Sequence, residues 1–178
     1  MAMNAPVQRY TLPARALHGL TVMAMLTVFA LALGMDGMPL SPRKLHLINY
    51  HKWAGVTVLA LAILRVVWRI YRRPPPLPAE TPRHEVGIAH ATHALLYLLM
   101  FSVPLLGWAY SSAKGFPVVW FGVLPLPALL APNPELAETL KWIHERMAWG
   151  LGGLIVLHVA AALKHRFIDR DTIMQRMI

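Results

Sequence analysis

Residues 16–35 form a run of 20 positions without a single charged side chain. A helix of that length covers about 30 Å, which is the thickness of the hydrocarbon core of a bilayer. The rest of the chain has the same character, because 57% of its 178 residues are hydrophobic and only 14% are charged. A soluble domain has roughly 25% charged residues. We therefore expect an integral membrane protein and exclude a soluble or intrinsically disordered one.

Three further apolar segments predict three further spans. Residues 86–113 and 147–163 are uncharged, whereas the segment that begins at Trp53 is interrupted by Arg65 and Arg69, which can snorkel to an interface. We place the spans at approximately 14–35, 45–71, 84–112 and 141–166 of a single domain, 1–178. The apolar piece 118–130 contains Pro125 and Pro127, so we expect it at the interface rather than as a fifth span. The predicted fold is an all-α four-helix membrane bundle.

The positive charges predict the orientation of the bundle. The net charge of +9 does not indicate nucleic-acid binding, because the basic residues flank the apolar runs instead of forming one face. With four spans, one side carries eleven basic residues: Arg9, Arg15, Arg65, Arg69, Arg72, Arg73, Arg83, Lys164, Arg166, Arg170 and Arg176. The other side carries six: Arg43, Lys44, Lys52, Lys114, Lys141 and Arg146. This excess predicts that both termini lie in the cytoplasm. A cleaved signal peptide is the alternative interpretation of the first segment, although its apolar run is longer than is typical.

Histidines are the candidate functional residues. The chain has nine of them and no cysteine, which excludes thiolate-held clusters and thioether-attached haem. Ionisable residues within membrane spans are rare and indicate function. By predicted depth the histidines form two layers. The cytoplasmic layer holds His18, His90, His93, His158 and His165, and the opposite layer holds His46, His51 and His144.

One helix serves both layers. His144 and His158 are fourteen residues apart, so they project from one helical face about 21 Å apart along the axis. His51 is the deeper candidate partner of His144, whereas His18, His90 and His93 all reach the depth of His158. Paired imidazoles from facing helices, without a carboxylate or thiolate at that depth, favour an axially ligated haem iron over zinc or non-haem iron. Interhelical hydrogen bonds or a proton relay are the alternatives.

Five segments carry a resemblance to a known family: RYTLPARALHGL, LINYHKWAGVTVLALAILRVVWR, GIAHATHALLYLLMFSVPLLGW, LKWIHERM and LHVAAALKHRFIDRDTIMQRM. Across essentially the whole chain they resemble the bacterial cytochrome b561 family, four-helix inner-membrane proteins with two stacked b haems. The resemblance implies that His18 and His158 ligate the cytoplasmic-side haem iron, and that His51 and His144 ligate the other. Gly19 departs from the pattern, because the family often has Trp after the first ligand.

The resemblance also implies a reaction, because it extends to small members that oxidise superoxide and reduce ubiquinone. Lys52, Lys114, Lys141 and Arg146 on the outer face, or the arginines on the inner face, are candidates for steering the superoxide anion, and the sequence leaves the side of entry open. For the quinone we single out Arg65 as a headgroup contact, with Arg15 and Arg69 at similar depth, and His165 as a hydrogen-bond or proton donor. An interfacial anchor is an equal alternative for His165, and His90 and His93 are interhelical hydrogen-bonding residues or haem-propionate partners.

The sequence is also compatible with two other functions. Related cytochromes are haem-bearing anchor subunits of larger dehydrogenases or hydrogenases, and the connection 114–141 would then receive a soluble protein partner. A haem-free transport or structural bundle is the third alternative, since the chain has proline-broken segments and intramembrane histidines.

Overall fold

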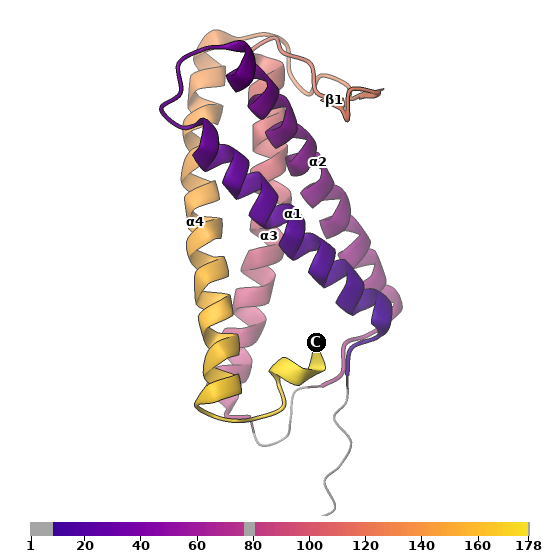
Figure 1. The fold of residues 1–178 in the computed structure, drawn as a ribbon. Helices are drawn as coiled ribbons and strands as arrows, with labels where there is room; N and C mark the ends of the chain where they lie inside the picture. Colours follow the sequence, from indigo (N-terminus) through magenta and orange to yellow (C-terminus); the bar gives the residue numbers. More distant parts are fainter. Residues whose placement is uncertain (1–8, 77–80, 178) are drawn as a thin grey trace, which may run out of the picture.

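The protein is a bundle of four long helices (Figure 1). The computed structural model describes residues 9–76 and 81–177. The helices are α1 (Leu12–Met35), α2 (Pro42–Tyr71), α3 (Arg83–Ala113) and α4 (Pro134–Phe167). Between α3 and α4 lies a hairpin of β1 (Val119–Trp120) and β2 (Leu124–Pro125), and a 3₁₀ turn, η1 (Met174–Arg176), follows α4. All four long helices are long and apolar enough to cross a membrane, so the predicted four-helix membrane bundle is confirmed.

The start of each long helix is encoded locally. Pro13, Pro42 and Pro134 occupy the first turns of α1, α2 and α4, where the missing N–H costs nothing. The Ser41 hydroxyl accepts a hydrogen bond from the Lys44 amide at 3.3 Å, and the Asn133 side chain accepts one from the Leu136 amide at 3.0 Å. These caps make α4 begin at residue 134, before the apolar run that the span prediction followed.

The four helices share a small buried core. A small core of Met25, Val58, Ala62, Met100, Val103 and Leu151 holds the helices together, while many large apolar side chains remain exposed on the outside, as expected for a surface in contact with lipid. The helix α1 packs mainly on α2, and α3 packs mainly on α4. Among the described residues, no Cα atom of α4 lies within 8 Å of one in α1 or α2. The contact between α4 and α1 is made by side chains instead, since the Phe29 ring lies against Gly152, where an added Cβ would be 3.4 Å from it.

The two ends of the bundle differ. At one end, here called the terminal end, both chain ends meet: the Tyr10 amide donates to the Arg176 carbonyl at 3.0 Å. At the other, the hairpin end, the β-hairpin folds back on α2 (Figure 1). The Trp53 indole donates to the Val119 carbonyl at 2.6 Å, and the Trp120 indole donates to the Thr57 hydroxyl at 3.2 Å. Residues 118–130 therefore form a hairpin and irregular chain rather than a fifth span.

Candidate functional site

His51 of α2 and His144 of α4 face each other near the hairpin end. Their ring centroids are 6.3 Å apart and their planes are inclined by 88°. Each Nδ1 donates to a backbone carbonyl of another helix: His51 to Val28 at 3.1 Å and His144 to Val103 at 2.9 Å. A carbonyl oxygen can only accept, so the proton lies on Nδ1 and the lone pair lies on Nε2. Residues of all four helices thus fix the two imidazoles, each in the tautomer whose Nε2 can bind a metal ion.

The geometry of this pair fits axial ligation of one iron. Two imidazoles that bind one metal ion from opposite sides, at metal–nitrogen distances of about 2.0 Å, place their ring centroids roughly 6 Å apart. The observed separation is 6.3 Å. A hydrogen bond from the second ring nitrogen to a carbonyl is the usual support for a histidine ligand.

Gly107 of α3 makes room for His144. A Cβ atom at position 107 would lie 2.9 Å from Cε1 and 3.2 Å from Nδ1 of the imidazole. The ring therefore lies directly against the backbone of α3, where it reaches the Val103 carbonyl. Sequence reasoning missed Gly107 and both carbonyls, because a lone glycine within an uncharged span carries no signal of what packs on it.

A second histidine cluster lies toward the terminal end. The rings of His93 and His158 are 5.5 Å apart between centroids and inclined by 71°. His18 lies close enough to both of them and to Arg65 for their charges to interact. Its Nδ1 atom is buried and has no hydrogen-bond partner in the described structure, so this nitrogen is available to a ligand. The structure thus brings three histidines together here, and His18 and His93 both lie near His158.

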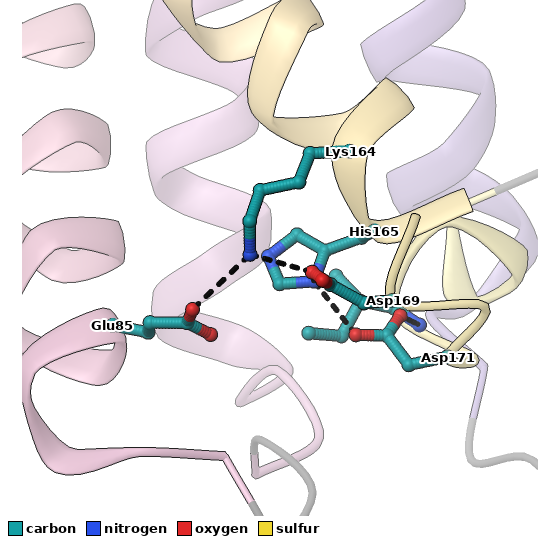
Figure 2. Close-up of polar contacts among 6 residues, drawn as sticks. Glu85, Lys164, His165, Asp169 and Asp171 are labelled. Atoms are coloured by element: carbon teal, nitrogen blue, oxygen red, sulfur yellow. Dashed lines mark hydrogen bonds and ion pairs between the residues drawn. The ribbon is translucent and has the colours of Figure 1, made fainter. Parts of the chain in front are cut away.

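The other histidines separate into two groups. His46, His84 and His90 are exposed to the surroundings of the bundle, so they do not face either cluster. His165 lies beyond α4's apolar part and contacts carboxylates: its Nδ1 is 2.6 Å from Asp171 and 3.2 Å from Asp169 (Figure 2). These partners, four and six residues beyond His165, escaped the sequence analysis.

Arg65 and His165, which were predicted to act together, have different surroundings. A cavity of about 210 Å³ opens at the terminal end, here called the terminal-end cavity, and its wall includes Arg65, Trp68, His93 and Tyr97. The Arg65 guanidinium lies 5.4 Å from the centre of the Tyr97 ring. His165 is not part of the wall. Tyr97 was missed, although it stands four residues after His93 on the same helical face.

The side chains around His165 also have the composition of a metal site. The potential ligand atoms of His165, Asp169 and Asp171 all lie within 4.8 Å of one another. However, the Lys164 ammonium lies 2.7 Å from the same Asp169 oxygen that contacts His165, and 3.2 Å from Glu85 (Figure 2). The carboxylates already have positive partners, so this cluster acts as an ion-pair network that ties the C-terminal segment to α3 and α4.

The cations predicted to steer superoxide differ in their partners. Lys114 forms an ion pair with Glu138 at 2.8 Å, and Lys141 lies 3.6 Å from Glu145. The hydrogen bond to Glu138 raises the pKa of Lys114 above its ordinary value. The Lys52 ammonium lies 5.8 Å from the Phe116 ring centre, with no ion pair to a carboxylate among the described residues. Lys52 is therefore the steering candidate on α2 whose charge is not neutralised, and it adjoins His51.

Comparison with known proteins identifies the family. The family model described as prokaryotic cytochrome b561 matches residues 9–178. The chain belongs to this family. It is 35% identical over 177 residues to cytochrome b561 homolog 2 of Escherichia coli (strain K12), which covers 98% of this chain and 93% of that protein. It is 33% identical over 129 residues to the protein named probable superoxide oxidase CybB of Yersinia pestis, with 72% of each chain covered.

A third relative is similar to this chain to a comparable extent. Cytochrome b561 homolog 1 of Escherichia coli (strain K12) is 32% identical over 132 residues, again with 72% of each chain covered. Membership makes the protein a membrane electron-transfer protein with b-type haem. The geometry of His51 and His144 and the buried unpartnered Nδ1 of His18 agree with that cofactor. The resemblance seen in the sequence is thereby confirmed.

Proposed function

We propose that the protein carries two b haems and transfers electrons from superoxide to ubiquinone. The observation that carries the proposal is the facing pair His51 and His144, 6.3 Å apart, with each Nδ1 held by a carbonyl. We assign the haem at the terminal end to His18 and His158. Since α4 carries one histidine of each pair, haems held by the two pairs would follow one another along this helix across the membrane.

The histidines determine the type of reaction. When bound, haem supplies one-electron redox chemistry. His51 with His144, and His18 with His158, would hold the haem iron, and with two protein ligands each iron would have no site for a substrate, so the group would supply electron transfer alone. Two superoxide anions each lose one electron and become oxygen. One ubiquinone takes up these two electrons and two protons and becomes ubiquinol.

The two ends of the bundle supply different residues to this reaction. At the hairpin end, Lys52 attracts the superoxide anion toward the His51 and His144 pair, because no carboxylate neutralises it in the described structure. At the terminal end, the Arg65 guanidinium, which lies 5.4 Å from the centre of the Tyr97 ring, donates to a quinone carbonyl. His165 supplies protons from the same end, where Asp169 and Asp171 orient it.

We further propose that the chain is a single domain in a bacterial inner membrane, with both termini in the cytoplasm. The two chain ends lie together at the terminal end, which is the end with the larger number of basic residues. The positive-inside rule then directs this end to the cytoplasm. Superoxide is consumed at the opposite face and quinone is reduced near the cytoplasmic one.

A visible absorption spectrum tests the proposed reaction. Purified, haem-loaded, air-oxidised protein receives a pulse of superoxide and then a short-chain ubiquinone. We expect b-type reduced bands that appear with superoxide, are prevented by added superoxide dismutase, and fade with ubiquinone. Bands that appear only with a chemical reductant contradict superoxide as the electron donor.

An electron-transfer subunit of a larger dehydrogenase or hydrogenase complex is the second candidate. The hairpin favours it, because Phe121, Val123 and Leu124 are exposed at the tip and offer an apolar surface to a protein partner. Isolation under mild conditions with a soluble redox partner in equal amount supports this candidate. Isolation of a single active polypeptide that superoxide reduces contradicts it.

A further inference from the structure

The terminal-end cavity carries more positive charge than quinone reduction requires. Of the residues that the structure describes, five arginines and no aspartate or glutamate line it: Arg9, Arg65, Arg69, Arg72 and Arg73. Three described carboxylates at this end, Glu85, Asp169 and Asp171, pair instead with Lys164 and His165 (Figure 2). Within the described residues, no ion pair joins any of the five arginines to a carboxylate.

Such a group of guanidinium ions matches an anion rather than a neutral headgroup. A quinone offers two weak carbonyl acceptors and no charge, so Arg65 is sufficient for it. Like charges that line one cavity repel each other, and a bound anion removes this repulsion. Arginine binds phosphate and carboxylate through two parallel hydrogen bonds, which makes it the usual residue for recognising these groups.

Hydrogen bonds connect the chain segments that surround the cavity. The Trp68 indole donates to the Thr11 hydroxyl at 2.9 Å and so connects α2 to the start of α1. The Arg176 side chain is buried and donates to the carbonyls of Pro75 and Pro76 at 3.0 and 2.7 Å. Through these contacts α1, the end of α2 and the C-terminal segment hold the cavity in a fixed shape.

The surroundings of the cavity indicate a lipid as the source of the anion. The cavity lies where α1 begins and α2 ends, which is the headgroup depth for helices that cross the bilayer. Beside it, Leu12, Val67 and Ile70 expose 75%, 57% and 77% of their surface, and can contact acyl chains. A volume of about 210 Å³ is below the roughly 300–1,000 Å³ of sites for drug-sized molecules, so it suits a headgroup alone. Basic pockets between membrane helices are known binding sites for acidic lipids.

We propose that this cavity binds the phosphate headgroup of an acidic phospholipid, with Arg9, Arg69 and Arg73 of its lining as the main contacts. The acyl chains run along the exposed apolar surface of α1 and α2. The proposal does not depend on superoxide or ubiquinone as substrates, because it rests on the charge, the walls and the position of the cavity.

The first test compares lipids on the unaltered protein. Haem-loaded protein in a neutral detergent receives phosphatidylglycerol, phosphatidylcholine with the same acyl chains, or inorganic phosphate. Thermal unfolding is followed by haem absorbance, and retained lipid is counted by native mass spectrometry. We expect phosphatidylglycerol alone to raise the unfolding midpoint, and one molecule of it to stay bound. Equal effects of phosphatidylcholine show a nonspecific detergent-like effect, and equal effects of inorganic phosphate show a free-anion site. Either result overturns the lipid proposal.

The second test uses matched variants. Arg69→Gln with Arg73→Gln removes two charges from the cavity, whereas Arg83→Gln with Arg170→Gln removes two exposed charges from the same end outside it. We expect roughly 30-fold weaker phosphatidylglycerol binding in the first variant, because one basic residue near an acidic lipid contributes about fivefold. The second variant binds as the unaltered protein does.

Two results would overturn the assignment of the ligand. Equal weakening in both variants shows that general surface charge, rather than the cavity, attracts the lipid. Loss of one haem from the cavity variant with unchanged lipid binding shows that these arginines hold the carboxylates of the cofactor. If the cavity variant does not fold, the comparison of phosphatidylglycerol and phosphatidylcholine on the unaltered protein decides the question.

Discussion

At the scale of single residues, the orientation of an imidazole decides whether it can bind a metal ion. The carbonyls of Val28 and Val103 hold the Nδ1 atoms of His51 and His144, which leaves the unprotonated nitrogen of each ring as its Nε2. Depth and helical spacing were sufficient to predict this histidine pair from the sequence. The two carbonyls and Gly107 were not predictable, because their roles depend on the register between helices. For His158, depth alone left several partners, and the structure still places both His18 and His93 nearby.

Gly107→Ala tests the cradle around His144. The added methyl would lie 2.9 Å from the imidazole, so we expect His144 to move and the protein to lose much of the haem at the hairpin end. Overpacking of this kind costs about 1–3 kcal/mol. Gly87→Ala on the same helix is the control, since nothing lies within 4 Å of its Cβ position. Haem content and the reduced spectrum are measured, and equal haem content in the two variants would show that Gly107 does not position the ligand.

His18→Ala and His93→Ala distinguish the two candidate partners of His158. We expect His18→Ala to lose one haem, because its buried Nδ1 has no hydrogen-bond partner in the described structure, as expected for a ring that binds a cofactor. We expect His93→Ala to keep both haems with a shifted spectrum, because its ring contacts His158 without being a ligand. The pyridine haemochrome absorbance per polypeptide is the measurement, and haem loss confined to His93→Ala would reverse the assignment.

At the scale of elements, α4 is the central one, because it supplies His144 and His158. The apolar run predicted its existence, and its true start depends on Asn133 and Pro134, which lie outside that run. The hairpin was not predicted as such. Strands of two residues are too short for a periodic pattern. The glycine at position 122, whose φ is 73° in the structure, is the residue that indicates the hairpin turn in the sequence.

Asn133→Ala tests the start of α4. The Asn133 side chain accepts from the Leu136 amide, and its backbone amide donates to the Ala113 carbonyl at 2.8 Å. Loss of such a cap costs about 1 kcal/mol, which lowers the thermal midpoint by roughly 2–4 °C in a protein of this size. Asn133→Ser keeps a capping oxygen and should restore most of the midpoint. Equal midpoints for the serine and alanine variants would show that the cap does not contribute.

At the scale of the whole molecule, both chain ends meet at one end of the bundle, and this follows from an even number of spans. The sequence predicted four spans and an excess of basic residues on the terminal side, so topology was accessible without coordinates. The distance of the α4 backbone from the backbones of α1 and α2 could not be predicted, because hydropathy does not report how far apart helices pack. The position of the terminal-end cavity also depends on chain segments that are far apart in sequence.

Single introduced cysteines test the orientation, since the chain has no cysteine of its own. Val123→Cys places a thiol on the hairpin, where Val123 is 82% exposed, and Arg170→Cys places one at the terminal end. In intact cells a membrane-impermeant maleimide should label position 123 and not position 170. After the cells are opened, both should react. The reverse pattern would place the termini outside the cytoplasm.

The most direct test of the two-haem arrangement is to count haems in two double variants that each lack two histidines. His51→Ala with His144→Ala removes both ligands of one proposed site, so one haem per polypeptide should remain. His51→Ala with His158→Ala removes one ligand from each site, so both haems should be lost. The same haem count in the two variants would contradict the pairing of His51 with His144 and of His18 with His158.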